Sequence, residues 1–232
     1  MEKAILFDLD GTLCRMDERV TEFYLNDMGQ DFLDVLPEGE FFPNIMKSTY
    51  WAIKNPSLDK SCYEVCLQHF CQRYQLDYAD VDSRMKKFYH ERYPKYGKMV
   101  DKIPLAPEVV KAAKKWGWLT ILASNALMPQ TAMQERIRWC GIDPVDFDLI
   151  PGIDTMHFAK PTLQFYKELM QKAAISDPRC CLMVGNSPQE DMIAADVGME
   201  TFLVMEEGIM PDLSKAKYHG NLQDLLNLIN KK

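Results

Sequence analysis

From about residue 103 to its end, the chain alternates short apolar runs with segments that have the pattern of amphipathic helices. Short apolar runs ended by turn signals are typical of buried strands. Proline near a helix start and glycine just past a helix end mark several of the helical segments. We therefore predict strands at 4–7, 119–124, 147–151, 180–184 and 201–204, and helices at 108–116, 129–140, 161–174, 191–197 and 222–229. This alternation predicts an α/β fold, in which a parallel sheet carries helices on both faces.

Residues 16–97 have a different character. They contain many aromatic side chains and apolar residues at helical spacing, but no convincing strand pattern. Proline and glycine divide the stretch into segments. We therefore expect a small all-helical domain at 16–97, inserted after the first strand of a core that is made of 1–15 and 98–232.

Composition excludes several classes of protein. The 232 residues are 47% hydrophobic and 26% charged, as in ordinary globular proteins, and the net charge of -7 argues against nucleic-acid binding. No apolar stretch approaches the roughly 20 residues that span a bilayer, and the N-terminus lacks the pattern of a signal peptide. The seven cysteines are odd in number and scattered, which predicts reduced thiols. We expect a cytoplasmic protein without a membrane or nucleic-acid partner.

The first predicted strand ends in two carboxylates, Asp8 and Asp10, followed by Gly11 and Thr12. Two acids beside a buried strand are costly unless something compensates their charge, and a divalent cation with oxygen ligands would do so. A solvated turn is the alternative, because aspartate and glycine are common turn residues. On this segment alone the two interpretations are about equally good.

Other polar residues follow further strands of the predicted sheet. Ser124 and Asn125 end one strand, Asn186 ends another, and Lys160 lies just before a helix. Because ligands bind at the carboxyl ends of parallel strands, we expect these residues to meet Asp8 at one edge. Carboxylates, a hydroxyl and an ammonium group together are suited to handling a phosphate.

In this arrangement the chain resembles the haloacid dehalogenase (HAD) superfamily over nearly its whole length. Its four motifs occur in order, and the inserted helical unit resembles the cap that members of one class carry between the first two motifs. The motifs are Asp8-Leu-Asp10-Gly-Thr12, Ser124 with Asn125, Lys160-Pro161, and Gly185-Asn186 with Asp191 downstream. The resemblance implies a Rossmann-like core.

The resemblance also implies roles for these residues. Asp8 would attack phosphorus and form an aspartyl-phosphate, and Asp10 would serve as general acid and then as general base. Ser124, Asn125 and Lys160 would bind the substrate, with Ser124 and Lys160 holding the transferring phosphoryl group. Mg²⁺ would be bound by Asp8, by the backbone carbonyl of Asp10 and by an oxygen from Asn186 or Asp191.

One position departs from the family pattern. Asn186 stands where the family usually has aspartate, which removes one negative charge from the expected metal site. An amide oxygen still ligates Mg²⁺, so we expect a functional but weaker metal site, with Asp191 compensating directly or through water. Which of Asn186, Glu190 and Asp191 touches the ion stays open.

These observations predict a Mg²⁺-dependent phosphatase that acts on a small phosphorylated metabolite. The second carboxylate, Asp10, favours phosphoryl transfer over dehalogenation, because the dehalogenating members lack it. One alternative is a phosphomutase that uses the same nucleophile. Another, prompted by Asn186, is a catalytically weak member that acts as a binding module. No motif in 16–97 predicts the substrate, and none in the chain predicts an oligomeric state.

Overall fold

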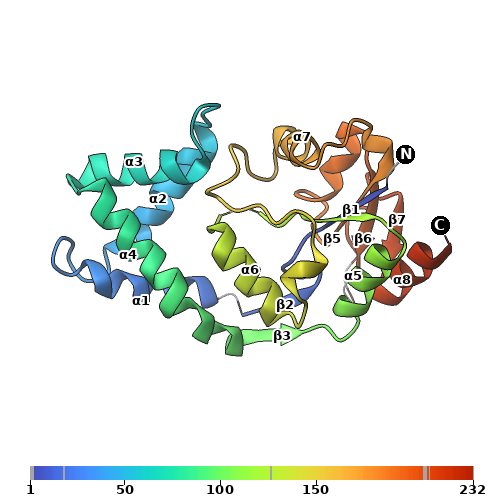
Figure 1. The fold of residues 1–232 in the computed structure, drawn as a ribbon, viewed down its shortest axis with the longest axis horizontal. Helices are drawn as coiled ribbons and strands as arrows, with labels where there is room; N and C mark the ends of the chain where they lie inside the picture. Colours follow the sequence, from blue (N-terminus) through green and yellow to red (C-terminus); the bar gives the residue numbers. More distant parts are fainter. Residues whose placement is uncertain (1–2, 18, 126, 206–207, 209, 232) are drawn as a thin grey trace.

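A five-stranded sheet lies at the centre of one end of the molecule, in the order β4-β1-β5-β6-β7 with all neighbours parallel (Figure 1). Its strands are β1 (Ala4–Phe7), β4 (Leu119–Leu122), β5 (Cys181–Gly185), β6 (Glu200–Val204) and β7 (Tyr218–Gly220). The structure is a computed structural model that describes residues 3–17, 19–125, 127–205, 208 and 210–231. The parallel sheet confirms the predicted Rossmann-like α/β class.

Alternate residues of β1 and β5 face opposite apolar clusters, as the pleat of a strand requires. In β1, Ile5 and Phe7 belong to one cluster, and Ala4 and Leu6 belong to the other. The first cluster includes apolar residues of α5 (Ala106–Lys115), α6 (Gln130–Trp139) and α8 (Leu222–Lys231). The second includes those of α7 (Leu163–Lys172) and of the 3-10 helix η5 (Met192–Val197). Helices therefore cover both faces, as predicted.

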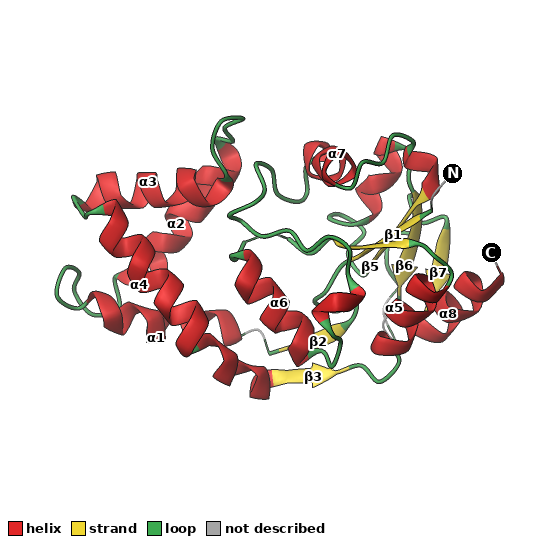
Figure 2. Ribbon diagram, in the orientation of Figure 1, coloured by secondary structure: helices red, strands yellow, loops and turns green. Residues whose placement is uncertain are grey.

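A group of helices occupies the other end of the molecule, beyond α6 as seen in Figure 2. In chain order it consists of α1 (Val20–Gly29), η1 (Gln30–Phe32), α2 (Phe41–Lys54), α3 (Cys62–Tyr74), α4 (Tyr78–Glu91) and η2 (Tyr93–Met99). The helical character expected for this stretch is therefore present. Short strands precede and follow the group, namely β2 (Cys14–Met16) and β3 (Val100–Lys102), which pair antiparallel. The division of the chain into two domains stays a prediction.

The structure corrects several predicted elements. The expected strand at 147–151 is wrong: only Leu149 forms a bridge, to Ile121, because the Asp148 carboxylate accepts the Thr120 N–H at 2.8 Å. The segment at 191–197 is a 3-10 helix, which ends at Gly198 where φ is +101°. The paired strands β2 and β3 were not predicted, and neither was β7.

The cysteines agree with one expectation from composition. All seven cysteines are described, none is in a disulfide, and all but Cys180 are buried. This confirms the prediction of free thiols. In the part of the chain that is described, no helix has the length and apolar character needed to cross a membrane.

Candidate active site

Three strand ends meet around Asp8. The Asp8 N–H donates to the carbonyl of Val184 in β5 at 2.9 Å, and the N–H of Ala123, just past β4, donates to the Phe7 carbonyl at 2.6 Å. β1 is therefore flanked by the residues that follow these two strands. This register places Ser124 on one side of Asp8 and Asn186 on the other, as the motif order suggested.

Lys160 joins two buried carboxylates. Its Nζ donates to Asp8 Oδ1 at 2.9 Å and to Asp191 Oδ1 at 2.5 Å. All three side chains are nearly inaccessible to solvent. Burial raises the pKa of Asp8 to about 7, against the opposing charge of Lys160. Burial lowers the pKa of Lys160, but the two carboxylates outweigh this effect and the net shift is upward.

The turn after β1 brings Asn186 to the same site. The Thr12 hydroxyl donates to Asp8 Oδ2 at 3.1 Å and lies 3.4 Å from Asn186 Oδ1. Gly11 has a φ of +77°, and a Cβ there would lie 2.1 Å from Asn186 Nδ2. Only glycine fits this turn, because it allows positive φ and leaves room for the amide. Thr12 and Gly11 therefore connect two of the expected metal ligands.

Asp191 uses both of its carboxylate oxygens within the protein. Oδ1 accepts from Lys160, and Oδ2 accepts from the Ser187 N–H at 2.9 Å. A Cβ at Gly185 would lie only 2.1 Å from Oδ2, so the last residue of β5 makes room for this carboxylate. The buried Asp191 therefore anchors Lys160 rather than pointing an unused oxygen into the site.

Asp10 pairs with an arginine that the sequence reasoning missed. Both of its carboxylate oxygens accept from the same guanidinium nitrogen of Arg136 in α6. Arg136 is buried although it is charged, whereas the Asp10 side chain is 42% exposed. A sequence signal existed, since Arg136 shares the apolar face of its helix with Ala132 and Met133. The structure thus separates the two acids of the first motif, each with its own cation.

Ser124 and Asn125 follow β4 beside Asp8. Ser124 is buried, and the Asp8 carboxylate beside it accepts from Thr12 and Lys160. The Asn125 side-chain oxygen is buried and has no hydrogen-bond partner among the described residues. A buried polar atom of this kind is costly, and a ligand that donates to it would remove the cost.

The loop at 151–162, which contains Lys160 and is called the lysine loop below, is hydrogen bonded to the N-terminus of α3. The Cys62 N–H donates to the Met156 carbonyl at 2.8 Å, and the Tyr63 N–H donates to the Ile153 carbonyl at 2.9 Å. These amides lie in the first turn of the helix and have no partner within it. The helical group and the lysine loop are thus joined by backbone hydrogen bonds.

A family model for haloacid dehalogenase-like hydrolases matches residues 2–197, which is most of the chain. The chain belongs to this family. The HAD hydrolase has no match among curated proteins. Members of the family generally use Mg²⁺.

Solved structures share the fold of the HAD hydrolase. A 2-haloacid dehalogenase of Pseudomonas syringae has a TM-score of 0.68 at 18% identity, with 100% of this chain and 99% of that chain covered. A HAD phosphatase of Thermococcus onnurineus has a TM-score of 0.61 at 18% identity, with 98% and 97% covered. A Bacillus subtilis protein described as a magnesium-bound HAD hydrolase with interdomain movement has a TM-score of 0.55 at 15% identity, with 99% of each chain covered. At these identities the likeness concerns the fold, and the reaction has to be inferred from the site itself.

Proposed function

We propose that this HAD hydrolase is a Mg²⁺-dependent phosphatase that hydrolyses a small phosphate monoester through an aspartyl-phosphate. One observation carries the proposal: the two carboxylates of the first motif have separate partners. Asp8 is buried against Lys160, and Asp10 is held by Arg136. A hydrolase with two chemical steps needs both a nucleophile and a separate proton donor and acceptor.

In the first step, a carboxylate oxygen of Asp8 attacks phosphorus while the bond from phosphorus to the ester oxygen breaks. Asp10 gives its proton to that oxygen, and the alcohol leaves. In the second step, Asp10 takes a proton from water, which attacks phosphorus and releases inorganic phosphate from Asp8. Lys160 and the hydroxyl of Ser124 would neutralise and hold the phosphoryl oxygens in both steps.

The charge and donor chemistry of the site fit Mg²⁺. When Asp8 is ionised, it and Asp191 place two carboxylates against the one positive charge of Lys160, which leaves a net charge of -1 where a phosphate must bind. Burial is the main reason that the pKa of Asp8 is raised; Lys160 opposes the shift, and the charges of Asp191 and Asp10 add to it. A bound Mg²⁺ would supply the missing positive charge and would polarise the phosphoryl oxygens.

Oxygen donors for Mg²⁺ would come from Asp8, from the Asp10 backbone carbonyl and from the Asn186 amide. No group of three or more acidic, histidine or cysteine side chains suited to a metal exists among the described residues, so an amide and a carbonyl have to contribute. Such a donor set is ordinary for Mg²⁺, which keeps several waters. We assign Asp191, whose oxygens bind Lys160 and Ser187, to a water-mediated contact.

We further propose that residues 16–97 form a cap over this site. The support is their position between β2 and β3 and the hydrogen bonds from α3 to the loop that carries Lys160. A cap would exclude water other than the attacking molecule during transfer. Access for substrate would then require the helical group to move away from the sheet.

The test is a panel of phosphate monoesters assayed for phosphate release with and without Mg²⁺. Wild type is compared with Asp8→Asn, which keeps the shape of the side chain but not the nucleophile. Asp177→Asn is the matched control. Asp177 caps the short 3-10 helix that precedes β5, so it lies at the amino-terminal ends of the strands, away from Asp8. We expect Mg²⁺-dependent release that Asp8→Asn abolishes and the control retains.

The alternatives give different results in the same assay. Transfer of phosphate to a second substrate hydroxyl without release would identify a phosphomutase. Halide release from 2-haloacids would identify a dehalogenase. No turnover of any ester, even at high enzyme concentration, would favour a catalytically weak protein that acts as a binding module.

A further inference from the structure

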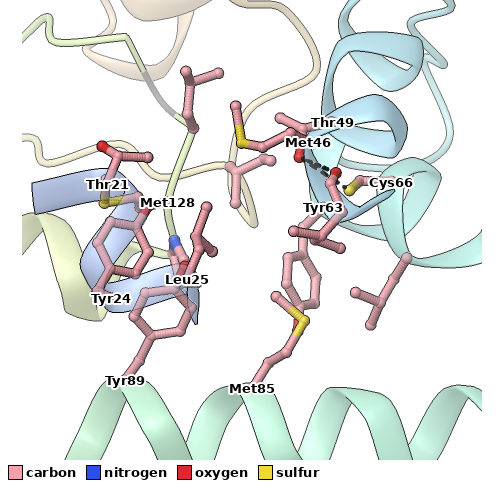
Figure 3. A pocket seen from close by; sticks show the side chains of 15 residues that line it. Thr21, Tyr24, Leu25, Met46, Thr49, Tyr63, Cys66, Met85, Tyr89 and Met128 are labelled. Atoms are coloured by element: carbon pink, nitrogen blue, oxygen red, sulfur yellow. Dashed lines mark hydrogen bonds between the residues drawn. The ribbon is translucent and has the colours of Figure 1, made fainter. Parts of the chain in front are cut away.

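A cavity of about 90 Å³ lies within the helical group, where it meets the loop after β4. Its walls come from α1, α2, α3 and α4 and from residues 127–129. Figure 3 shows Leu25 and Tyr24 facing Met46 and Tyr63 across the space, with Met85 below them. Among the described side chains that line it, none is charged.

The polar groups on the α2 and α3 side of the cavity are already bonded within the protein. The Thr49 hydroxyl donates to the Ile45 carbonyl at 3.0 Å and lies 3.4 Å from the Cys66 sulfur. The Tyr63 hydroxyl donates to an Asp82 carboxylate oxygen at 2.8 Å. A sugar or a carboxylate placed here would therefore meet few unused partners and would lose its bonds to water.

The α1 side connects the cavity to the reacting groups. The Tyr24 ring lies 5.2 Å from the ring of Tyr93, which in turn lies 4.8 Å from the ring of Trp139 in α6, the helix that carries Arg136. Burial raises the pKa of Tyr24 to about 12, and the charges of Arg136 and Asp10 act on its hydroxyl. This wall of the cavity therefore lies within electrostatic reach of the pair that holds the proposed general acid.

The loop on the remaining side follows directly from the second motif. The Leu127 N–H, in the cavity wall, donates at 2.8 Å to the carbonyl of Asn125, a proposed phosphate-binding residue. The next residue, Met128, donates nothing to the cavity but accepts the Tyr93 hydroxyl at its sulfur, 3.0 Å away. An ester whose phosphate lies beside Asn125 would thus direct its alcohol part toward an apolar space.

We infer that the alcohol part of the substrate is a small, uncharged, aliphatic group that binds in this cavity. The inference rests on the proposed phosphatase function and names its substrate class. The cavity is smaller than the roughly 150 Å³ apolar cavity that holds benzene. Three methionines in its wall, Met46, Met85 and Met128, adapt readily to ligands of different shape.

Shape-matched pairs of esters test the inference. 2-Methylbutyl phosphate has the shape of glycerol 1-phosphate, with methyl groups in place of the two hydroxyls. Isobutyl phosphate has the shape of 2-phosphoglycolate, with methyl groups in place of the two carboxylate oxygens. We expect kcat/KM for the apolar member of each pair to be higher by about tenfold or more, because buried hydroxyl and carboxylate groups would lack partners. Equal kcat/KM values, or a preference for the polar members, would overturn the inference.

Two variants on α1 localise the effect. Thr21→Phe adds a ring to the cavity wall, and Glu22→Phe adds the same ring at an exposed neighbour on the same helix. We expect Thr21→Phe to raise KM for 2-methylbutyl phosphate about tenfold or more. It should leave competitive inhibition by inorganic phosphate unchanged, and Glu22→Phe should alter neither quantity. Met85→Phe is the second filling variant if Thr21→Phe does not fold, and an unchanged KM in a folded filling variant would count against the inference.

Direct binding separates failure of the inference from failure of the proposed function. If no phosphate ester is hydrolysed, including p-nitrophenyl phosphate with Mg²⁺, the phosphatase proposal fails. Titration of the wild type with 2-methyl-1-butanol, followed by ligand-observed NMR, then tests the cavity alone. Saturable binding that is lost in Thr21→Phe supports an apolar ligand, and absence of saturable binding rejects it.

Discussion

Asp10 and Arg136 form an ion pair whose two members differ in exposure, and this difference predicts unequal effects of mutation. Arg136 is buried, whereas the Asp10 side chain is 42% exposed. Asp10→Asn leaves a buried cation without its counter-charge, which we expect to lower the free energy of unfolding by about 2 kcal/mol. Arg136→Met leaves a carboxylate that water reaches, so its cost should be smaller. Urea unfolding followed by circular dichroism measures both, and the reverse order would contradict the interpretation.

The raised pKa of Asp8 predicts that Mg²⁺ binding depends on pH. A carboxylate has to be ionised to ligate a cation, and burial raises this pKa from 3.8 to about 7. Without metal, the contribution of Asp8 to stability is complete below its unfolded pKa and is lost as the pH rises through about 7. Mg²⁺ should therefore raise Tm more at pH 8 than at pH 5.5. Differential scanning fluorimetry measures the shift, and Asp8→Asn should show little shift at either pH.

Among individual residues, the sequence predicted those that lie in motifs. It missed Arg136, whose partner is far away along the chain. Asp8, Ser124 and Asn186 were placed together because they follow strands whose carboxyl ends share an edge. Arg136 reaches a partner 126 positions away, and only the folded arrangement of α6 beside the β1 turn reveals that contact. The sequence shows that Arg136 lies on the apolar face of its helix, but it does not show that Asp10 is the partner.

Among the elements, α3 depends on its first turn both for its own stability and for its contact with the lysine loop. Ser61 caps the helix, accepting from the Glu64 N–H at 3.3 Å, while the Glu64 carboxylate accepts from the Ser61 N–H at 2.8 Å. The next two amides bond to the loop before Lys160. The capping box thus fixes the helix end that holds the loop.

Ser61→Ala should therefore affect both stability and catalysis. We expect a loss of about 1 kcal/mol in the free energy of unfolding, the usual cost of a lost cap. Asp77→Ala is the control, because Asp77 caps a different helix, α4, through the Asp80 N–H. Both variants should lose similar stability, but only Ser61→Ala should lower kcat/KM for phosphate esters. An equal effect of both on kcat/KM would argue against a role for the contact between α3 and the loop.

Element by element, the sequence predicted most helices and the inner strands but not the short strands. Proline and glycine delimit α5 and α6, and the uniform apolar runs of β1 and β5 are typical of strands buried on both faces. β2 and β3 contain three residues each, and β3 is largely exposed, so both are too short for an apolar pattern to be recognised. At 147–151 a side-chain carboxylate replaces strand pairing, which periodicity does not report.

At the scale of the whole molecule, one apolar cluster runs from the sheet into the helical group. It includes Phe7 and Val184 from the sheet, Ile137 from α6, and Phe70 and Tyr93 from the helical group. Because the two parts share this core, we expect the protein to unfold in a single cooperative transition. Far-UV circular dichroism and tryptophan fluorescence should give coincident urea curves. Two separate transitions would show instead that the helical group folds on its own.

The hydrogen bonds from Cys62 and Tyr63 to the lysine loop also have a consequence for timing. Any separation of the helical group from the sheet that breaks these bonds leaves both amides open to solvent protons. The rate at which the two amides take up deuterium therefore measures how often the molecule opens. A tightly bound phosphate analogue should slow that uptake. The exchange rate of these two amides would then report how often the helical group opens during turnover.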